Sequence, residues 1–475
     1  MARRGYDLVI VGLGSAGLVA ADLAAHLGLK VAAVERDRIG GDCLWGGCVP
    51  SKALLASARA AHAMRTADRF GLTPVEPLID TKPVLERIRR IQHDIERSDD
   101  NPELLAAKGV DVHFGAARLV GPRTVDVEGV GELHARFVLL CTGSRPAIPE
   151  VPGLSEAGYL TSETFWDQER LPESIVTIGG GPVGVELSQA CARLGVRTTL
   201  LQHGERLLPR EEPALADRLG GLLRCEGVEV VTDAHAHGVA VEAGEKVVRA
   251  TVGEQPREWR AQQIVVGAGR APNVEGLGLG EQGIEVNDRG VVVDGALRTS
   301  VRSVYAAGDL AGRFLFTHTA GYEGGVAVRN MFFPARSKAT ELVPWCTFTD
   351  PELAHVGPTE AEARERFGTR ARVWRYDLAE SDRARTDDAT EGEIRILTVR
   401  GKIVGAHLLA PNAGDLIGEL TLAIDRGKPL RDLATLVHVY PTRSLAFAEL
   451  GGQASYELAD RFGFLVRSRP WRRGR

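Results

Sequence analysis

The sequence predicts an α/β protein with two nucleotide-binding domains built on parallel sheets, followed by a further C-terminal domain. Two segments of the chain show the same order of strand, glycine-rich turn and helix, which is typical of a dinucleotide-binding unit. The chain has 475 residues, of which 44% are hydrophobic and 25% charged. This length exceeds what one hydrophobic core normally serves, so we expect several packed domains.

The first unit begins with the apolar, β-branched run Asp7–Val11, which leads into Gly12-Leu-Gly14-Ser-Ala-Gly17 and an alanine-rich helical stretch. A second apolar run ends at Glu35, where the Rossmann pattern places a carboxylate that accepts hydrogen bonds from a ribose hydroxyl. The glycines let the backbone approach a pyrophosphate, and the helix N-terminus stabilises its charge.

The second unit repeats this order at Ser174–Ile178, followed by Gly179-Gly-Gly181-Pro-Val-Gly184 and the run Arg197–Leu201. Glu35 lies 23 positions after Gly12, and Gln202 lies 23 positions after Gly179. One such glycine motif is weak evidence, whereas two copies in the same register predict two dinucleotide sites.

Gln202 stands where a carboxylate would repel the extra phosphate of NADPH. His203 and Arg206 follow closely and offer groups that can meet a phosphate. We therefore expect NADPH rather than NADH, with the alternative that these residues are only polar groups of a solvated turn.

Cys43 and Cys48 are five positions apart. Five residues of regular helix rise about 7.5 Å, beyond the limit of about 7 Å between the Cα atoms of a disulfide, so the segment must leave the helix. Gly46 and Gly47 give the backbone this freedom, and Pro50 marks a helix start. Cys48 is expected at a helix N-terminus, which favours its thiolate, and Cys43 further out on a loop.

A zinc site is not expected, because zinc needs four ligands and no second pair of Cys or His motifs is present. The remaining cysteines stand singly in apolar or helical contexts. We expect buried, inert thiols at Cys141, Cys191, Cys225 and Cys346.

The formal net charge of -5 offers no basic field for nucleic acid, and no apolar run reaches the roughly 18 residues of a membrane helix. Six cysteines cannot form a disulfide scaffold in so long a chain, which fits a reducing cytoplasm. The start Met1-Ala-Arg-Arg and the apolar stretch after it resemble a secretory signal. Asp22, His26 and Lys30 interrupt that stretch, which counts against a signal. The arginines of residues 466–475 are expected to form a basic solvated tail.

With two dinucleotide units and the CxxxxC segment between them, the chain resembles the FAD- and pyridine-nucleotide-dependent disulfide reductases, which include glutathione reductase, lipoamide dehydrogenase and mercuric reductase. The resemblance covers nearly the whole chain. It extends to Cys141-Thr-Gly143-Ser-Arg-Pro146, Gly269-Arg-Ala-Pro-Asn273 and Ala306-Ala-Gly-Asp309. Trp45 and the stretch 343–351 look most like the mercuric-reductase-like branch.

The resemblance implies a glutathione-reductase-type architecture and a homodimer. Its parts would be an FAD domain (1–155 and 275–335), a NAD(P) domain (156–274) and an α+β dimerisation domain (336–465) that completes the partner's active site. The implied cofactor-binding residues are Gly12, Gly14, Ser15, Ala16, Gly17, Glu35, Arg36, Gly41, Lys52, Ala116, Thr142, Gly143, Gly179, Gly181, Gly184, Gln202, His203, Gly269, Arg270, Gly308 and Asp309.

The implied activity is the passage of electrons from NAD(P)H through FAD to a Cys43–Cys48 disulfide, with Cys48 next to the flavin. Lys52 and Glu186 match family positions that pair beside the flavin, where a lysine stabilises negative charge. Tyr440 occupies the position of the family's acid–base histidine.

This last position departs from the family pattern, because Tyr440 and Leu445 stand where a histidine and a glutamate are usual. A free tyrosine has a pKa near 10, against about 6.5 for histidine, so it is a poor base at neutral pH. His438, two residues earlier, would point to the opposite face of an extended segment. Efficient exchange with lipoamide or glutathione is therefore not expected.

Mercury reduction also loses support, because mercuric reductases use a C-terminal cysteine pair and no cysteine follows Cys346. We expect a small oxidised acceptor: a reactive oxidant, a thiophilic metal ion or an unusual disulfide. Three alternatives stay open: a quinone or dye reductase that uses flavin directly, a conventional dihydrolipoyl dehydrogenase, and a non-catalytic redox sensor.

Overall fold

The computed structural model describes residues 5–467. The signal-like start 1–4 and most of the expected basic tail (468–475) lie outside the described residues. The chain divides into two compact units. The first comprises Met1–His62, Pro77–Glu205 and Gly227–Glu341, and the second comprises Ala63–Glu76, Arg206–Glu226 and Leu342–Arg475. The segment Arg206–Glu226, inside the expected NAD(P) domain, thus clusters with the C-terminal part of the chain.

The first sheet of unit one carries the first glycine motif. Its strand order is β3 (Val110–Phe114), β2 (Val31–Glu35), β1 (Gly5–Val11), β6 (Gly131–Leu140), β5 (Thr124–Val127) and β4 (Ala117–Gly121), and β18 (Val304–Ala306) also pairs with β6. Strands β1, β2, β3, β6 and β18 pair with one another in parallel, whereas β5 is antiparallel to β6 and β4. Both faces are buried: Leu8 and Ile10 belong to one core cluster, and Val9 and Val11 to another.

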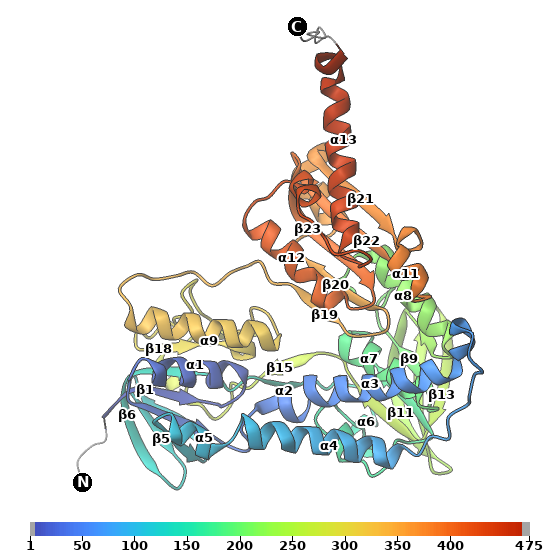
Figure 1. The fold of residues 1–475 in the computed structure, drawn as a ribbon. Coiled ribbons are helices and arrows are strands. Elements are labelled where there is room, and N and C mark those ends of the chain that lie inside the picture. Colours follow the sequence, from blue (N-terminus) through green and yellow to red (C-terminus); the bar gives the residue numbers. More distant parts are fainter. Residues whose placement is uncertain (1–4, 468–475) are drawn as a thin grey trace, which may run out of the picture. The chain divides into compact units, whose positions relative to one another are not determined.

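Two helices lie side by side on one face of this sheet, α1 (Ser15–His26) and α9 (Thr317–Phe332) (Figure 1). Their close approach requires glycine, because a Cβ atom on Gly324 would lie 2.3 Å from the carbonyl oxygen of Ala16. The N-terminus of α9 is therefore held in a fixed place against the first nucleotide-binding unit.

The second sheet of unit one carries the second glycine motif. It contains four parallel strands, β10 (Glu229–Val231), β9 (Arg197–Leu201), β8 (Ser174–Ile178) and β14 (Gln263–Val266). Helix α7 (Pro182–Arg193) follows β8. An antiparallel sheet of β11 (Ala234–Glu242), β12 (Glu245–Val252) and β13 (Gln255–Ala261) shares a core with it.

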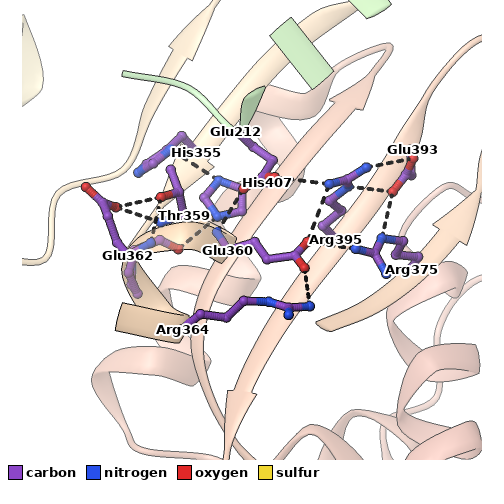
Figure 2. A network of polar contacts seen from close by, with 11 residues as sticks. Glu212, His355, Thr359, Glu360, Glu362, Arg364, Arg375, Glu393, Arg395 and His407 are labelled. Carbon is purple, nitrogen blue, oxygen red and sulfur yellow. Dashed lines mark hydrogen bonds and ion pairs between the residues drawn. The ribbon is translucent and has the colours of Figure 1, made fainter. Parts of the chain in front are cut away.

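Unit two contains an antiparallel sheet in the order β19 (Trp345–Thr347), β20 (Glu352–Val356), β23 (Lys402–Ala410), β22 (Glu393–Val399) and β21 (Ala371–Asp377). Its main helices are α8 (Pro213–Cys225), α10 (Glu360–Phe367), α12 (Ala413–Asp425) and α13 (Leu445–Arg467). Buried charges hold the α8 segment to the sheet: Arg395 lies 3.0 Å from Glu212 and 2.5 Å from Glu393 (Figure 2).

The remaining helices are α2 (Gly41–Trp45), α3 (Cys48–Arg65), α4 (Thr81–Ser98), α5 (Pro102–Ala107), α6 (Leu154–Ala157) and α11 (Asp382–Thr386), and the remaining strands are β7 (Ser144–Pro146), β15 (Arg270–Pro272), β16 (Val286–Asn287) and β17 (Gly290–Val291). Within residues 5–467, none of the helices is both long and apolar enough to cross a membrane.

Candidate active site

The cysteine segment leaves the helix between its two sulfurs, as its spacing predicts. Helix α2 ends at Trp45 and α3 begins at Cys48, while the N–H groups of Gly46 and Gly47 both donate to the carbonyl of Asp42, at 2.9 and 2.6 Å. The expectation of a loop around Cys43 is wrong, since this residue lies in α2. The left-handed conformations of Gly40 and Gly41 turn the chain directly into this short helix.

Cys48 lies at two helix N-termini. It is the first residue of α3, and its Sγ lies 3.2 Å from the Oγ1 of Thr317, the first residue of α9. The hydrogen bond from Cys43 lowers the pKa of Cys48 to about 6, with further help from Thr317 and the positive charge of Lys52, against burial and the charge of Glu186.

The hydrogen bond to Cys48, together with burial, raises the pKa of Cys43. In the reduced state the pair therefore holds one proton, on Cys43, and Cys48 is a thiolate at neutral pH. A thiolate is the nucleophilic form of cysteine.

Lys52 and Glu186 lie together in this region. The Nζ of Lys52, on α3, is 2.8 Å from the Oε2 of Glu186, on α7. Glu186 is buried, with 5% of its surface exposed, and the lysine supplies its positive partner. The pairing that the resemblance implies is therefore present in the structure.

The two glycine turns have the same backbone geometry. Gly12 has φ +98° and Gly179 has φ +115°, and a Cβ atom on either would lie 2.4 Å from a carbonyl oxygen, that of Cys141 or Gly267. A Cβ atom on Gly17 would lie 1.9 Å from the carbonyl oxygen of Gly12, and one on Gly184 equally close to that of Gly179. Both turns therefore require glycine at these positions, as the tight turn and close helix–strand packing of a dinucleotide-binding motif do.

The residues at the ends of the two second strands also correspond. The carboxylate of Glu35 accepts the N–H of Leu13 at 2.8 Å, and the side-chain oxygen of Gln202 accepts the N–H of Gly180 at 2.9 Å. Each acceptor holds the residue that follows the first glycine of its turn. The spacing of 23 positions in the sequence therefore reflects one repeated structure.

A polar cluster lies beside the first turn. Asp309 accepts a hydrogen bond from Ser144 at 2.5 Å, and Arg270 lies 2.7 Å from the Oγ of Ser144 and 3.1 Å from Asp42. The Oδ1 atom of Asp42 is buried and makes no hydrogen bond to the described residues, and burial raises the pKa of this carboxyl. A ribityl or ribose hydroxyl can satisfy such an acceptor, so the cluster fits FAD.

Sequence reasoning missed three residues here. Asp42 and Thr317 carry no motif of their own, and Glu323 lies inside α9. Glu323 is buried and accepts the N–H of Gly308 at 2.9 Å, which fixes the backbone just before Asp309. The loss of hydration on burial raises the pKa of Glu323 to about 7. A buried carboxylate in an apolar helix face was the only signal available in the sequence.

Three other predicted cofactor positions make hydrogen bonds within the chain. The carbonyl of Ala116 accepts the N–H of Glu128 at 2.9 Å, and Thr142 donates to the carbonyl of Asn273 at 2.9 Å. Arg36 follows Glu35 and donates its N–H to that carboxylate.

Tyr440 belongs to unit two, whereas Cys43 and Cys48 belong to unit one. Its side chain is exposed, its hydroxyl donates to Asp382 at 3.0 Å, and this contact raises its pKa. His438 instead lies 3.1 Å from Glu419 with a buried side chain, so the two rings have different partners and surroundings. The Tyr440–Pro441 bond is cis.

The other four cysteines only partly match the expectation. Cys141 and Cys191 are buried, and burial raises the pKa of Cys191 to about 12. The expectation is wrong for Cys225, which is exposed at the last residue of α8, and for Cys346, which is half-buried in the short strand β19. Single positions at the ends of elements do not reveal their burial through periodicity. In the part of the chain that is described, no three His, Cys, Asp or Glu side chains are placed to hold a metal ion.

Two cradles for dinucleotides and an activated cysteine pair together define a flavin- and pyridine-nucleotide-dependent redox protein. Residues 6–324 match the model of the pyridine nucleotide-disulphide oxidoreductases, and residues 343–450 match the dimerisation domain of that family. The chain belongs to this family of FAD- and NAD(P)H-dependent enzymes, which confirms the predicted fold class, cofactors and reaction class, and it carries the family's dimerisation domain.

Two of the relatives have different named activities. The chain is 35% identical to a mercuric reductase of Streptomyces lividans, with 94% of this chain and 95% of the relative covered. It is 35% identical to a dihydrolipoyl dehydrogenase of Thermus scotoductus, covering 94% and 96%. Among solved structures it resembles the HOCl-induced flavoprotein disulfide reductase RclA from Escherichia coli, with a TM-score of 0.84, 26% identity and coverage of 94% and 99%.

Proposed function

We propose that this protein uses NADPH to reduce a small oxidised acceptor through Cys43 and Cys48, the acceptor being a reactive oxidant, a thiophilic metal ion or an unusual disulfide. One arrangement carries the proposal: Cys48 begins α3 with its Sγ 3.2 Å from Thr317, the first residue of α9, and the hydrogen bond from Cys43 lowers its pKa to about 6. The glycine turns bind the two dinucleotides, and FAD, when bound, supplies the transfer of an electron pair from NADPH to the disulfide.

Residues of this chain stabilise the reduced pair. The N-termini of α3 and α9 and the ammonium group of Lys52 favour negative charge on the sulfur of Cys48. Cys43 carries the remaining proton and is the sulfur that meets the acceptor. Asp42 and Arg270 connect the cysteine segment to the loop of Asp309.

The number of protons that the reaction requires favours a reactive oxidant as the acceptor. A thiol and a thiolate react with hypochlorous acid to give a disulfide, chloride and water: the S–S bond forms, the O–Cl bond breaks, and the proton of Cys43 joins that of the acid in the water. No proton from another side chain is needed. Reduction of a disulfide substrate instead leaves a second thiolate to be protonated, which is the task of the histidine that Tyr440 replaces.

The solved relative supports the same acceptor classes. RclA is described as HOCl-induced, and a structure of its Cu(II) complex, 25% identical to this chain, has a TM-score of 0.84. A thiolate is also the ligand that soft metal ions prefer. We further propose that the protein acts as a homodimer in the cytoplasm, where a reducing environment suits an exchangeable cysteine pair.

An acceptor screen tests the proposal. The purified protein with FAD would be supplied with NADPH and, in turn, a hypochlorous acid derivative, Cu(II), lipoamide, oxidised glutathione and a quinone. We expect turnover with the first two that collapses in Cys43→Ser. Quinone reduction that survives in Cys43→Ser, with no activity toward the others, would favour the alternative in which flavin reacts directly with the acceptor.

A further inference from the structure

His203 directly follows the strand that ends the second nucleotide-binding unit. In Rossmann domains this edge faces the ribose 2′ position, where a carboxylate favours NADH and a cationic donor accommodates the 2′-phosphate of NADPH. Here the equivalent of Glu35 is the uncharged Gln202, whose oxygen is held by Gly180. The structure thus removes the repelling carboxylate and places an imidazole next to it.

This imidazole belongs to a chain of three residues, His203, His235 and Asp233. The Nε2 atom of His203 lies 3.2 Å from the Nδ1 of His235, and the Nε2 of His235 lies 3.2 Å from the Oδ1 of Asp233. The two rings meet edge to face with their centroids 4.1 Å apart. His235 lies near the start of β11, 32 positions after His203. All three residues are exposed.

The order of hydrogen bonds in this chain has a consequence for anions. The carboxylate of Asp233 can only accept, so the Nε2 of His235 carries a hydrogen and its Nδ1 accepts one from His203. A protonated His203 would then donate Nε2–H to His235 and Nδ1–H outward. Within residues 5–467 that Nδ1 atom makes no hydrogen bond, so only the protonated form of the ring has a donor for an anion at the ribose edge.

We propose that His203, held in place by His235 and Asp233, binds the 2′-phosphate and makes this protein select NADPH over NADH. The proposal rests on the NADPH preference stated above and deepens it by adding His235, a residue outside every nucleotide motif. His203 is the residue that touches the phosphate, and His235 is a positioning residue that accepts its second N–H.

Binding of two adenine nucleotides that differ only at the 2′ position tests the pair. The probes are adenosine 2′,5′-bisphosphate and AMP, measured by calorimetry on the FAD-loaded protein, with NADP⁺ and NAD⁺ as the full cofactors. We expect the wild type to bind the bisphosphate more tightly. His203→Ala and His235→Ala should each weaken it about tenfold or more, as the loss of a hydrogen bond to a charged group does, with AMP binding changed less than about twofold.

Two comparisons separate the possible failures. His237→Ala, an exposed histidine on the same strand, is the matched control and should leave both affinities unchanged. The double variant should lose less than the product of the single losses, because the two residues act as one unit. A wild type that binds AMP and the bisphosphate equally overturns both the NADPH preference and the pair, whereas a wild-type preference that survives in His203→Ala overturns the pair alone. Neither result depends on Cys43 or Cys48, since no turnover is measured.

Discussion

The ammonium group of Lys52 lies 2.8 Å from the carboxylate of Glu186, although the two residues are 134 positions apart. Replacement of Lys52 by Met removes this positive charge from beside a buried carboxylate. We expect a loss of about 1–3 kcal/mol in the free energy of unfolding, measured by chemical denaturation. Lys82→Met is the matched control, because the Lys82–Glu169 pair is exposed and such pairs contribute about 1 kcal/mol or less. Equal losses in the two variants would contradict the account.

Thr317 should control the ionisation of Cys48. Because its hydroxyl stabilises the thiolate, Thr317→Val should raise the pKa of Cys48, while Thr317→Ser should keep it. Alkylation of the reduced protein at different pH values, with the adduct at position 48 counted by mass spectrometry, measures this. The rate should rise with a midpoint near pH 6 in the wild type and at higher pH in Thr317→Val. Identical profiles for the Val and Ser variants would remove Thr317 from the site.

Arg395 should stabilise unit two through its buried contacts with Glu212 and Glu393 (Figure 2). Loss of one partner of a buried pair leaves an uncompensated charge, so Arg395→Ala should cost about 3–5 kcal/mol. Arg372 lies on the neighbouring strand β21 and forms an exposed pair with Glu457 of α13. Arg372→Ala should cost about 1 kcal/mol or less. Thermal unfolding of both variants decides, and a small effect at Arg395 would show that water reaches this network.

Tyr440 should limit exchange with disulfide substrates. Its hydroxyl donates to Asp382, which raises its pKa, so it is a poor base at neutral pH. General acid–base catalysis contributes about a hundredfold or more, so Tyr440→His, alone or with Leu445→Glu, should increase reduction of lipoamide or oxidised glutathione. Tyr440→Phe, which also lacks a base, is the control and should show no gain. A wild type that already reduces these disulfides rapidly would show that another group supplies the proton.

Local patterns were enough to predict both nucleotide-binding units. The strands before Gly12 and Gly179, the helices after them and the acceptors Glu35 and Gln202 all depend on short-range spacing. The position of Cys48 at a helix N-terminus followed from glycines and a proline in its own segment. These features form within about thirty residues of chain and leave a periodic signature.

Contacts between distant segments could not be predicted in this way. Thr317 reaches Cys48 across 269 positions and His235 reaches His203 across 32, and neither belongs to a pattern with a fixed spacing. The segment Arg206–Glu226 clusters with the C-terminal unit, and its Glu212 contacts the buried Arg395. Such contacts are set by tertiary packing, which the patterns of a single sequence do not predict.

Counting thiols before and after anaerobic reduction tests most directly whether electrons leave through sulfur. The oxidised protein would be treated with excess NADPH without oxygen, unfolded in acid and titrated with a thiol reagent. A two-electron reduction of one disulfide should yield a gain of about two thiols per chain, lost again when the acceptor is added, and absent in Cys43→Ser. A wild type that bleaches its flavin and reduces the acceptor with no change in thiol content would contradict the account.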